Sequence, residues 1–194
     1  MEKDQGELLK TITSFLEKNR IPYMITGAWS AIYYSRPRAS HDIDFVVELH
    51  QKNIKRVLSV FDKLSGDFLV QVESIKEAIA NKKGMFSILH LPTMLKLDFW
   101  VLKSESFDRL RFSRRRKVKI LNQFMEMASS EDTILQKLRW YKKGKIEKHL
   151  IDAAFVYQIQ KKNLDNKYLQ VWAKKLGLNK YFEELEKINL GEYI

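Results

Sequence analysis

Two aspartates have a spacing that could do chemistry. Asp42 and Asp44 open an apolar run that reads as a strand over residues 43–47. Side chains alternate along a strand, so both carboxylates point to one face, with Cα atoms about 6.5 to 7 Å apart. Like charges at that spacing repel each other, which favours a compensating cation. We therefore predict a Mg²⁺ site at the start of this strand.

A third carboxylate, Asp98, interrupts an apolar run over residues 95–101. An unpaired aspartate inside a buried strand is costly, although on an edge strand it would face solvent. Three carboxylates on neighbouring strands fit a two-metal site for phosphoryl transfer, where one ion activates a hydroxyl and the other binds a triphosphate. Because all the ligand atoms are oxygens, Mg²⁺ or Mn²⁺ is favoured over zinc.

The segments around these acids are predicted to alternate between helix and strand. A strand over residues 23–26, then Gly27 and a helix over 28–34, would bring backbone N–H groups close to an anion. Apolar spacing predicts further helices over residues 7–18, 52–64 and 74–81, and strands over 68–72, 85–91 and 94–102.

The chain beyond about residue 123 is predicted to be helical. Its patterns favour a helix that starts near Ser129 and further helices over residues 148–161, 166–176 and 178–188. We therefore expect an α+β fold, in which a mixed sheet flanked by helices is followed by helices. Residues 1–123 would form the α/β core, and residues 124–194 a helical region packing on it.

Composition narrows the possible functions. The 194 residues are 45% hydrophobic and include no cysteine, which excludes disulfides and thiolate metal sites. The N-terminus is too charged for a signal peptide, and no apolar run reaches membrane-spanning length, so we expect a cytoplasmic location and no membrane partner.

The charge of the chain points to an anionic partner. The formal net charge is +11, and residues 103–121 alone hold eight basic and two acidic residues. That segment favours a phosphate-rich substrate, with a solvated face as the alternative.

Gly27-Ala28, Asp42-Ile43-Asp44-Phe45 and Leu97-Asp98-Phe99 follow one another in that order. This order resembles the nucleotidyltransferase superfamily related to DNA polymerase β. Its motifs are a Gly and a small residue at a helix start, then hDhDh, then a later hDh, where h is hydrophobic. The resemblance implies Mg²⁺-dependent transfer of a nucleoside monophosphate from an NTP to an acceptor hydroxyl, with release of pyrophosphate. Asp42 and Asp44 would bind both metals, and Asp98 would bind the catalytic metal and act as the base.

Residues 27–30 and 38–44 are similar to bacterial aminoglycoside nucleotidyltransferases and to AbiEii-type toxins. The family's usual first motif is Gly-Ser, whereas Ala28 stands here, so backbone N–H groups and the Ser30 hydroxyl would have to bind phosphate. Arg38 and Ser40 match the Arg-x-Thr/Ser that precedes the acids in these relatives. Arg38 would reach a phosphate, with a solvent-facing loop arginine as the alternative.

The resemblance to AbiEii-type proteins extends into the helical region. Residues 131–138 fit the motif Glu-Asp-x-x-x-x-Lys-Leu, and Asp152 matches a later aspartate on the next helix. The resemblance implies that Lys137 contacts the nucleotide phosphates and that Asp152 orients the nucleotide or positions the substrate. The alternatives are a solvated lysine, and a surface acid paired with a neighbour such as Lys148.

The acceptor stays open at this point. A polycationic aminoglycoside would favour an acidic cleft, whereas a basic protein suits tRNA or another RNA. The AbiEii resemblance adds a toxin role and a cognate antitoxin as a possible partner. A nucleotide-binding module without turnover is the competing hypothesis, and Ala28 is its main support.

Overall fold

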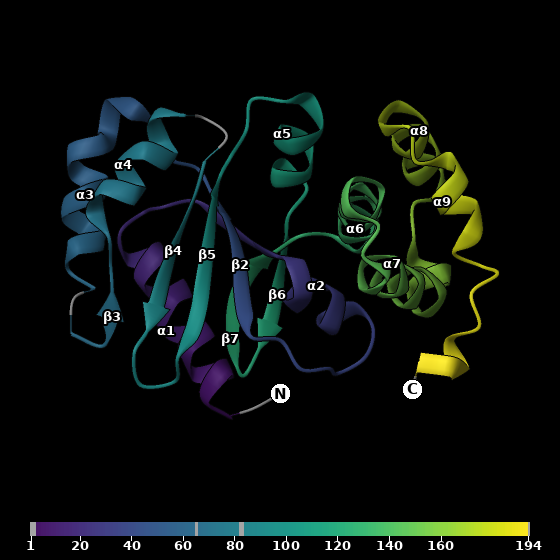
Figure 1. The fold of residues 1–194 in the computed structure, drawn as a ribbon, viewed down its shortest axis with the longest axis horizontal. Coiled ribbons are helices and arrows are strands. Elements are labelled where there is room, and N and C mark those ends of the chain that lie inside the picture. The colour runs from purple at the N-terminus through teal and green to yellow at the C-terminus, as the bar shows by residue number, and fades with distance from the viewer. Residues whose placement is uncertain (1–2, 65, 82–83, 194) are drawn as a thin grey trace. The chain divides into compact units, whose positions relative to one another are not determined.

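The computed structural model describes residues 3–64, 66–81 and 84–193 (Figure 1). Up to residue 127 its elements are α1 Lys3–Lys18, β1 Tyr23–Thr26, α2 Gly27–Tyr34, β2 Asp42–Val47, η1 Gln51–Asn53, α3 Ile54–Asp62, β3 Phe68–Leu69, α4 Val72–Ala80, β4 Met85–His90, β5 Leu95–Val101, α5 Ser106–Ser113, β6 Arg116–Ile120 and β7 Gln123–Met127. The elements that follow are α6 Ser130–Gly144, α7 Glu147–Gln160, η2 Lys161–Asn163, α8 Asn166–Leu176, α9 Asn179–Glu184 and η3 Leu190–Tyr193.

The chain divides into two compact units. Unit 1 contains the described residues of 1–29 and 39–127, and unit 2 contains those of 30–38 and 128–194. The division falls inside α2, so a short segment from the first half of the chain belongs to the helical unit.

Unit 1 is built on a mixed sheet. Within the described residues, seven strands follow the order β3-β4-β5-β2-β1-β7-β6. The pairs β2/β5 and β1/β7 are parallel, and the other neighbours are antiparallel. The strands β2 and β5, which carry the three acids, lie side by side in the middle of this sheet.

One face of the central strands is aromatic. Phe45 on β2 stacks on Phe99 of β5 with ring centroids 5.1 Å apart, and Phe99 stacks on Phe86 of β4 at the same distance. Phe61 of α3 meets Phe86 and Phe99 edge to face. Each such pair stabilises the core by about 0.5–1.5 kcal/mol beyond area burial. Since side chains alternate along a strand, the neighbours of Phe45 and Phe99 in sequence are turned to the opposite face.

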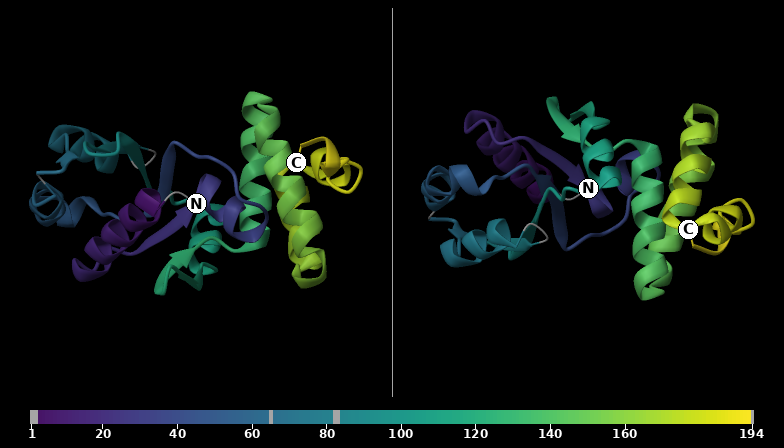
Figure 2. Two further views of the ribbon diagram at one scale, coloured as in Figure 1. Left: turned by 90° about the horizontal axis from the view of Figure 1, so that it is seen from below. Right: turned by 90° about the horizontal axis from the view of Figure 1, so that it is seen from above.

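Unit 2 is helical. In both views of Figure 2, α6 and α7 lie side by side as its two longest helices. Ser129 caps α6 by accepting a hydrogen bond from the Asp132 N–H, and Gly177 ends α8 in the left-handed conformation with φ of 65°. No helix in the described part of the chain is long and apolar enough to cross a membrane.

The predicted α+β class is confirmed, including the mixed sheet flanked by helices and the C-terminal helices. Helix was expected directly after residue 123, but residues 123–127 form strand β7, because they pair with β6 and β1. The basic segment 103–121, however, contains helix α5 and strand β6, which the sequence analysis did not assign. The strand expected over residues 68–72 is limited to Phe68–Leu69, because α4 begins at Val72.

Candidate active site

The three acids are brought together by the register of two parallel strands. In the β2/β5 pair, Asp44 lies directly opposite Asp98, and Asp42 lies opposite Lys96. Paired residues share a face of the sheet, so all four side chains lie on the face opposite the phenylalanines. Since β5 lies between β4 and β2 and Asp98 is 5% exposed, the alternative of a solvent-facing edge aspartate is wrong.

Each of the three carboxylates is oriented by a hydrogen-bond donor from unit 1. The Ser40 hydroxyl donates to Asp42 Oδ1 at 2.8 Å, and the Trp100 indole N–H donates to Asp44 Oδ1 at 3.2 Å. The Ser87 hydroxyl donates to Asp98 Oδ1 at 2.6 Å. Such partners fix the direction in which a carboxylate presents its oxygens to a cation.

Lys96 supplies a positive charge to this acidic face. Its Nζ lies 2.8 Å from Asp98 Oδ2. Hydrogen bonding to Asp98 raises the pKa of Lys96 above its usual value, against the opposing effect of burial, and the charges of Asp42 and Asp44 raise it further. The negative potential at this point therefore stabilises a cation.

The donor set fits a hard divalent cation. All of the candidate ligand atoms are carboxylate oxygens, which suit Mg²⁺ or Mn²⁺. Among the residues that the structure describes, no three acidic, histidine or cysteine side chains are already gathered closely enough to hold a metal ion. In this structure the cation that contacts Asp98 is the Lys96 ammonium.

Gly27 makes the close turn between β1 and α2. Its φ is +67°, and a β-carbon added there would lie 2.0 Å from Asp44 Oδ2. Only glycine fits this approach, because any side chain would displace the carboxylate. The next residues of α2 are buried, with Ala28 7% and Ser30 0% exposed.

Unit 2 contains a separate charged cluster centred on Asp152. Arg38 binds this carboxylate through two hydrogen bonds, Nε to Oδ1 at 2.9 Å and Nη2 to Oδ2 at 2.7 Å. Lys137 Nζ donates to Asp152 Oδ2 at 2.6 Å. Arg38 is thus neither solvent-facing nor unpaired, and the partners of Asp152 are these two cations rather than Lys148.

The two cations of the cluster keep Asp152 ionised. Burial alone would raise the pKa of Asp152, but the charge of Lys137 and the hydrogen bonds from Arg38 and Lys137 hold it below the usual value. Burial and the charge of Lys137 lower the pKa of His149, so the imidazole is neutral at pH 7. Asp152 is therefore ionised between an arginine and a lysine, two side chains whose N–H groups can donate to anionic groups.

The arginines of the basic segment are largely engaged within unit 1. Arg109 pairs with Glu48 at 2.7 Å, and the buried Arg111 pairs with Asp108 at 2.8 Å. Arg115 donates to the Phe112 carbonyl. The segment therefore presents less positive charge to the solvent than its count of basic residues suggests.

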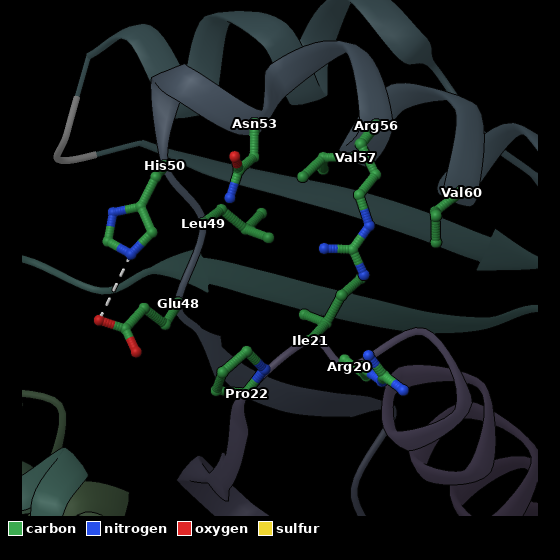
Figure 3. Close-up of a pocket in the computed structure, with 10 residues that line it drawn as sticks. All are labelled: Arg20, Ile21, Pro22, Glu48, Leu49, His50, Asn53, Arg56, Val57 and Val60. Carbon is green, nitrogen blue, oxygen red and sulfur yellow. Dashed lines mark ion pairs between the residues drawn. The ribbon is translucent and has the colours of Figure 1, made fainter.

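A pocket in unit 1 lies at the other end of β2. It has a volume of about 220 Å³ and a mixed polar and apolar lining (Figure 3). His50 Nε2 lies 3.6 Å from Glu48 Oε1 there. Arg56 donates a hydrogen bond to the Asn19 carbonyl. None of its lining residues is a candidate from the sequence analysis.

Sequence reasoning missed three residues at the acidic face. Lys96 and Trp100 are two positions either side of Asp98, so strand alternation was a signal that could have found them. Ser87 lies opposite Asp98 on β4, and only the strand register reveals that relationship.

Comparison with known proteins finds similarity at the level of structure. No family model and no curated protein matches the sequence. The antibiotic-resistance factor ANT(2'')-Ia superimposes with a TM-score of 0.60 at 13% identity, over 96% of this chain and 97% of that one.

Two further structures are similar. An antigenic nucleotidyltransferase-like protein from Paracoccidioides brasiliensis gives a TM-score of 0.55 at 15% identity, over 96% of this chain and 94% of that one. The lincosamide antibiotic adenylyltransferase LnuA gives 0.51 at 12% identity, over 78% and 95% of the two chains. At these identities the likeness is one of fold.

Proposed function

Because the chain has the nucleotidyltransferase fold, we propose that it transfers a nucleoside monophosphate from an NTP to an acceptor hydroxyl in a Mg²⁺- or Mn²⁺-dependent reaction. The observation that carries this proposal is the pairing of Asp44 with Asp98 across β2 and β5, with Asp42 on the same face. Three carboxylates on one sheet face are costly without a cation, and a metal-dependent phosphoryl transfer gives them a role.

The proposed chemistry assigns a role to each acid. Asp42 and Asp44 would hold both divalent cations and Asp98 would help to hold the catalytic one; when bound, the cations supply charge stabilisation to the triphosphate and the attacking oxygen. Asp98 accepts the proton of the acceptor hydroxyl as its oxygen attacks the α-phosphorus. The bond from the α-phosphorus to the bridging oxygen breaks, and pyrophosphate leaves with the electron pair.

The residues that orient the acids are part of the proposal. One oxygen of each carboxylate accepts a hydrogen bond, from Ser40, Ser87 or Trp100. These hydrogen bonds fix the orientation of the carboxylates on their common face of the sheet. Gly27 allows the β1–α2 turn to approach Asp44, and backbone N–H groups at the start of α2 are candidates for binding the triphosphate.

The Arg38–Asp152–Lys137 cluster is proposed as a phosphate-binding group of unit 2. The meeting of an arginine and a lysine at one carboxylate supports this role, because both side chains are donors that phosphate oxygens can accept from. Asp152 would act by positioning the two cations rather than by contacting the reacting atoms.

We propose RNA, with tRNA as the first candidate, as the acceptor. The net charge of +11 supports a polyanionic acceptor over a polycationic one. A small-molecule acceptor is the second candidate, favoured by the structural likeness to an antibiotic-resistance factor and a lincosamide antibiotic adenylyltransferase. If the modified RNA is essential, the protein would act as a toxin. Inducible expression of the protein should then arrest bacterial growth, and a variant without the three acids should not.

Pyrophosphate release tests the proposal. The full chain is incubated with each NTP, Mg²⁺ and either bulk tRNA, tobramycin or lincomycin. Release should require one acceptor class and should be lost in Asp42→Ala/Asp44→Ala, while Asp62→Ala/Asp67→Ala, which removes two exposed acids of unit 1, retains it. Mg²⁺-NTP binding without release under any condition would instead favour a binding module.

A further inference from the structure

Two segments of unit 2 carry basic residues and no acidic ones. Residues 133–146 hold five lysines or arginines, and residues 166–182 hold four. The first segment includes the C-terminal end of α6, and the second includes the C-terminal end of α8. The two segments therefore hold nine basic residues in sequence, of which Lys137 is paired with Asp152.

The structure brings the two segments together. Lys142 Nζ at the end of α6 donates to the Leu176 carbonyl at the end of α8, at 3.1 Å. Lys145 Nζ lies 4.2 Å from the ring centroid of Tyr181 and hydrogen-bonds to its hydroxyl, and Tyr141 meets Tyr181 edge to face at 5.2 Å. These contacts fix the two helix ends beside each other within unit 2.

Lysines and aromatic rings are interleaved on this surface. Lys143 lies 5.5 Å from the ring of Trp140, and Lys175 lies 4.8 Å from the ring of Trp172. Together with Lys174 these lysines are exposed, while Trp172 and Tyr181 are half-buried. We define the lysine surface by its five exposed lysines, Lys142, Lys143, Lys145, Lys174 and Lys175.

Three acidic residues of unit 2 have contacts with groups outside the lysine surface. Glu131 accepts from the Asp165 N–H, and Glu147 accepts from Tyr193. Glu186 pairs with Lys161 at 3.0 Å. These contacts leave the positive potential of the lysine surface in place.

Helix stabilisation does not account for the whole surface. Lysines in a last helical turn interact favourably with the helix dipole, and Lys142 also binds a terminal carbonyl of α8. Lys145 is fixed against two tyrosines. Lys143, Lys174 and Lys175 add three further exposed charges near the C-terminal ends of the same two helices.

We propose that the lysine surface binds the phosphodiester backbone of RNA. Lysines that contact successive phosphates, with indole and phenol rings beside them on which bases can stack, are the combination that sequence-tolerant RNA binding needs. The inference deepens the proposed function, because it rests on RNA being the acceptor and assigns the surface that holds it.

The test is the salt dependence of RNA binding, measured by fluorescence anisotropy with labelled bulk tRNA and no NTP. The variant Lys143→Gln/Lys174→Gln/Lys175→Gln is compared with the matched control Lys52→Gln/Lys55→Gln/Lys63→Gln, which removes three exposed lysines from unit 1. We expect the slope of log K against log salt to fall by about 2 to 3 in the surface variant and to be unchanged in the control. Affinity at low salt should fall at least tenfold.

Three results of the binding experiment would overturn the inference. They are the absence of RNA binding in the wild type, equal loss in the two triple variants, and tighter binding to phosphatidylserine vesicles than to tRNA through the same lysines. Because binding is measured without NTP, it is separable from catalysis. RNA binding through this surface without pyrophosphate release would count against the proposed function alone, whereas RNA-dependent release with unchanged KM for RNA in the surface variant would count against this inference alone.

Discussion

Asp44 and Asp98 are direct partners across the parallel strands β2 and β5, although 54 positions separate them in sequence. Their pairing places the third acid beside the second without help from any loop. The candidate catalytic geometry is therefore held by the backbone hydrogen bonds of the sheet, which are among the most rigid parts of a fold.

The Ser87 hydroxyl is expected to orient Asp98. Removing it in Ser87→Ala leaves Asp98 Oδ1 without this donor, so metal affinity should fall about tenfold or more. Titration of Mn²⁺ against the protein without NTP measures the change. Ser87→Thr keeps the hydroxyl and should restore affinity, and an alanine variant with unaltered Mn²⁺ binding would remove Ser87 from the site.

Lys96 is expected to compete with a divalent cation for Asp98. Two unit charges 4 Å apart interact by about 1 kcal/mol in water, so removing the ammonium in Lys96→Met should lower the half-saturating Mg²⁺ concentration about fivefold. The same variant should melt at a lower temperature without metal, because three carboxylates lose their compensating charge. Thermal melting across a Mg²⁺ series measures both effects. Lys55→Met, on the exposed part of α3, serves as the control, and an increased Mg²⁺ requirement in Lys96→Met would contradict the idea.

Gly27→Ala is expected to disrupt the acidic face. The added β-carbon would collide with the Asp44 carboxylate, so Mg²⁺ binding should be lost along with stability. Gly66→Ala is the matched control, because Gly66 also has a positive φ, of 114°, but no atom within 4 Å of an added β-carbon. That control should cost about 1–2 kcal/mol from backbone strain and leave Mg²⁺ binding intact. Equal effects of the two variants would show that strain, not collision, is responsible.

Asp152 is expected to stabilise unit 2 in its ionised form. In Asp152→Asn, Arg38 and Lys137 lose their shared anion, and breaking such a buried pair costs about 3–5 kcal/mol. Denaturant unfolding at pH 7 measures this cost, and Asp62→Asn, at an exposed position, controls for the chemical change.

The pH dependence of this stabilisation has a defined direction. Because the folded pKa of Asp152 lies below its usual value of 3.8, the contribution is complete above pH 3.8 and is lost as the pH falls through the folded pKa. The difference in melting temperature between wild type and Asp152→Asn should therefore be constant near pH 6 and shrink below pH 3.8. A difference that grows on acidification would contradict the assignment.

The acidic strand and its neighbours could be predicted because their signals are local. Alternation alone placed Asp42 and Asp44 on one face, and a glycine between a strand and a helix marked the β1–α2 turn. The C-terminal helices followed from apolar spacing, with boundaries that differ from the structure by a few residues.

The remaining features depend on tertiary contacts that no local pattern encodes. Arg38 and Asp152 are 114 positions apart, and nothing near either residue specifies the other. Ser87 reaches Asp98 only through the register of β4 with β5. The sequence analysis interpreted residues 103–121 by their charge and therefore assigned no helix or strand there, whereas the segment forms α5 and β6. Arg111 can lie buried in α5 because it pairs with Asp108, and the sequence does not reveal that pairing.

Because β2 and β5 carry core residues on one face and the acids on the other, correct strand register is required for both stability and the proposed activity. Phe45 and Phe99 build the core from the same strands that present Asp44 and Asp98, one residue away, to the other side. A slip of either strand by a single position would bury carboxylates among the phenylalanine rings and expose aromatic surface. Misaligned chains of this kind would be unstable as well as inactive, so the population that survives proteolysis should be the population that carries an assembled acidic face.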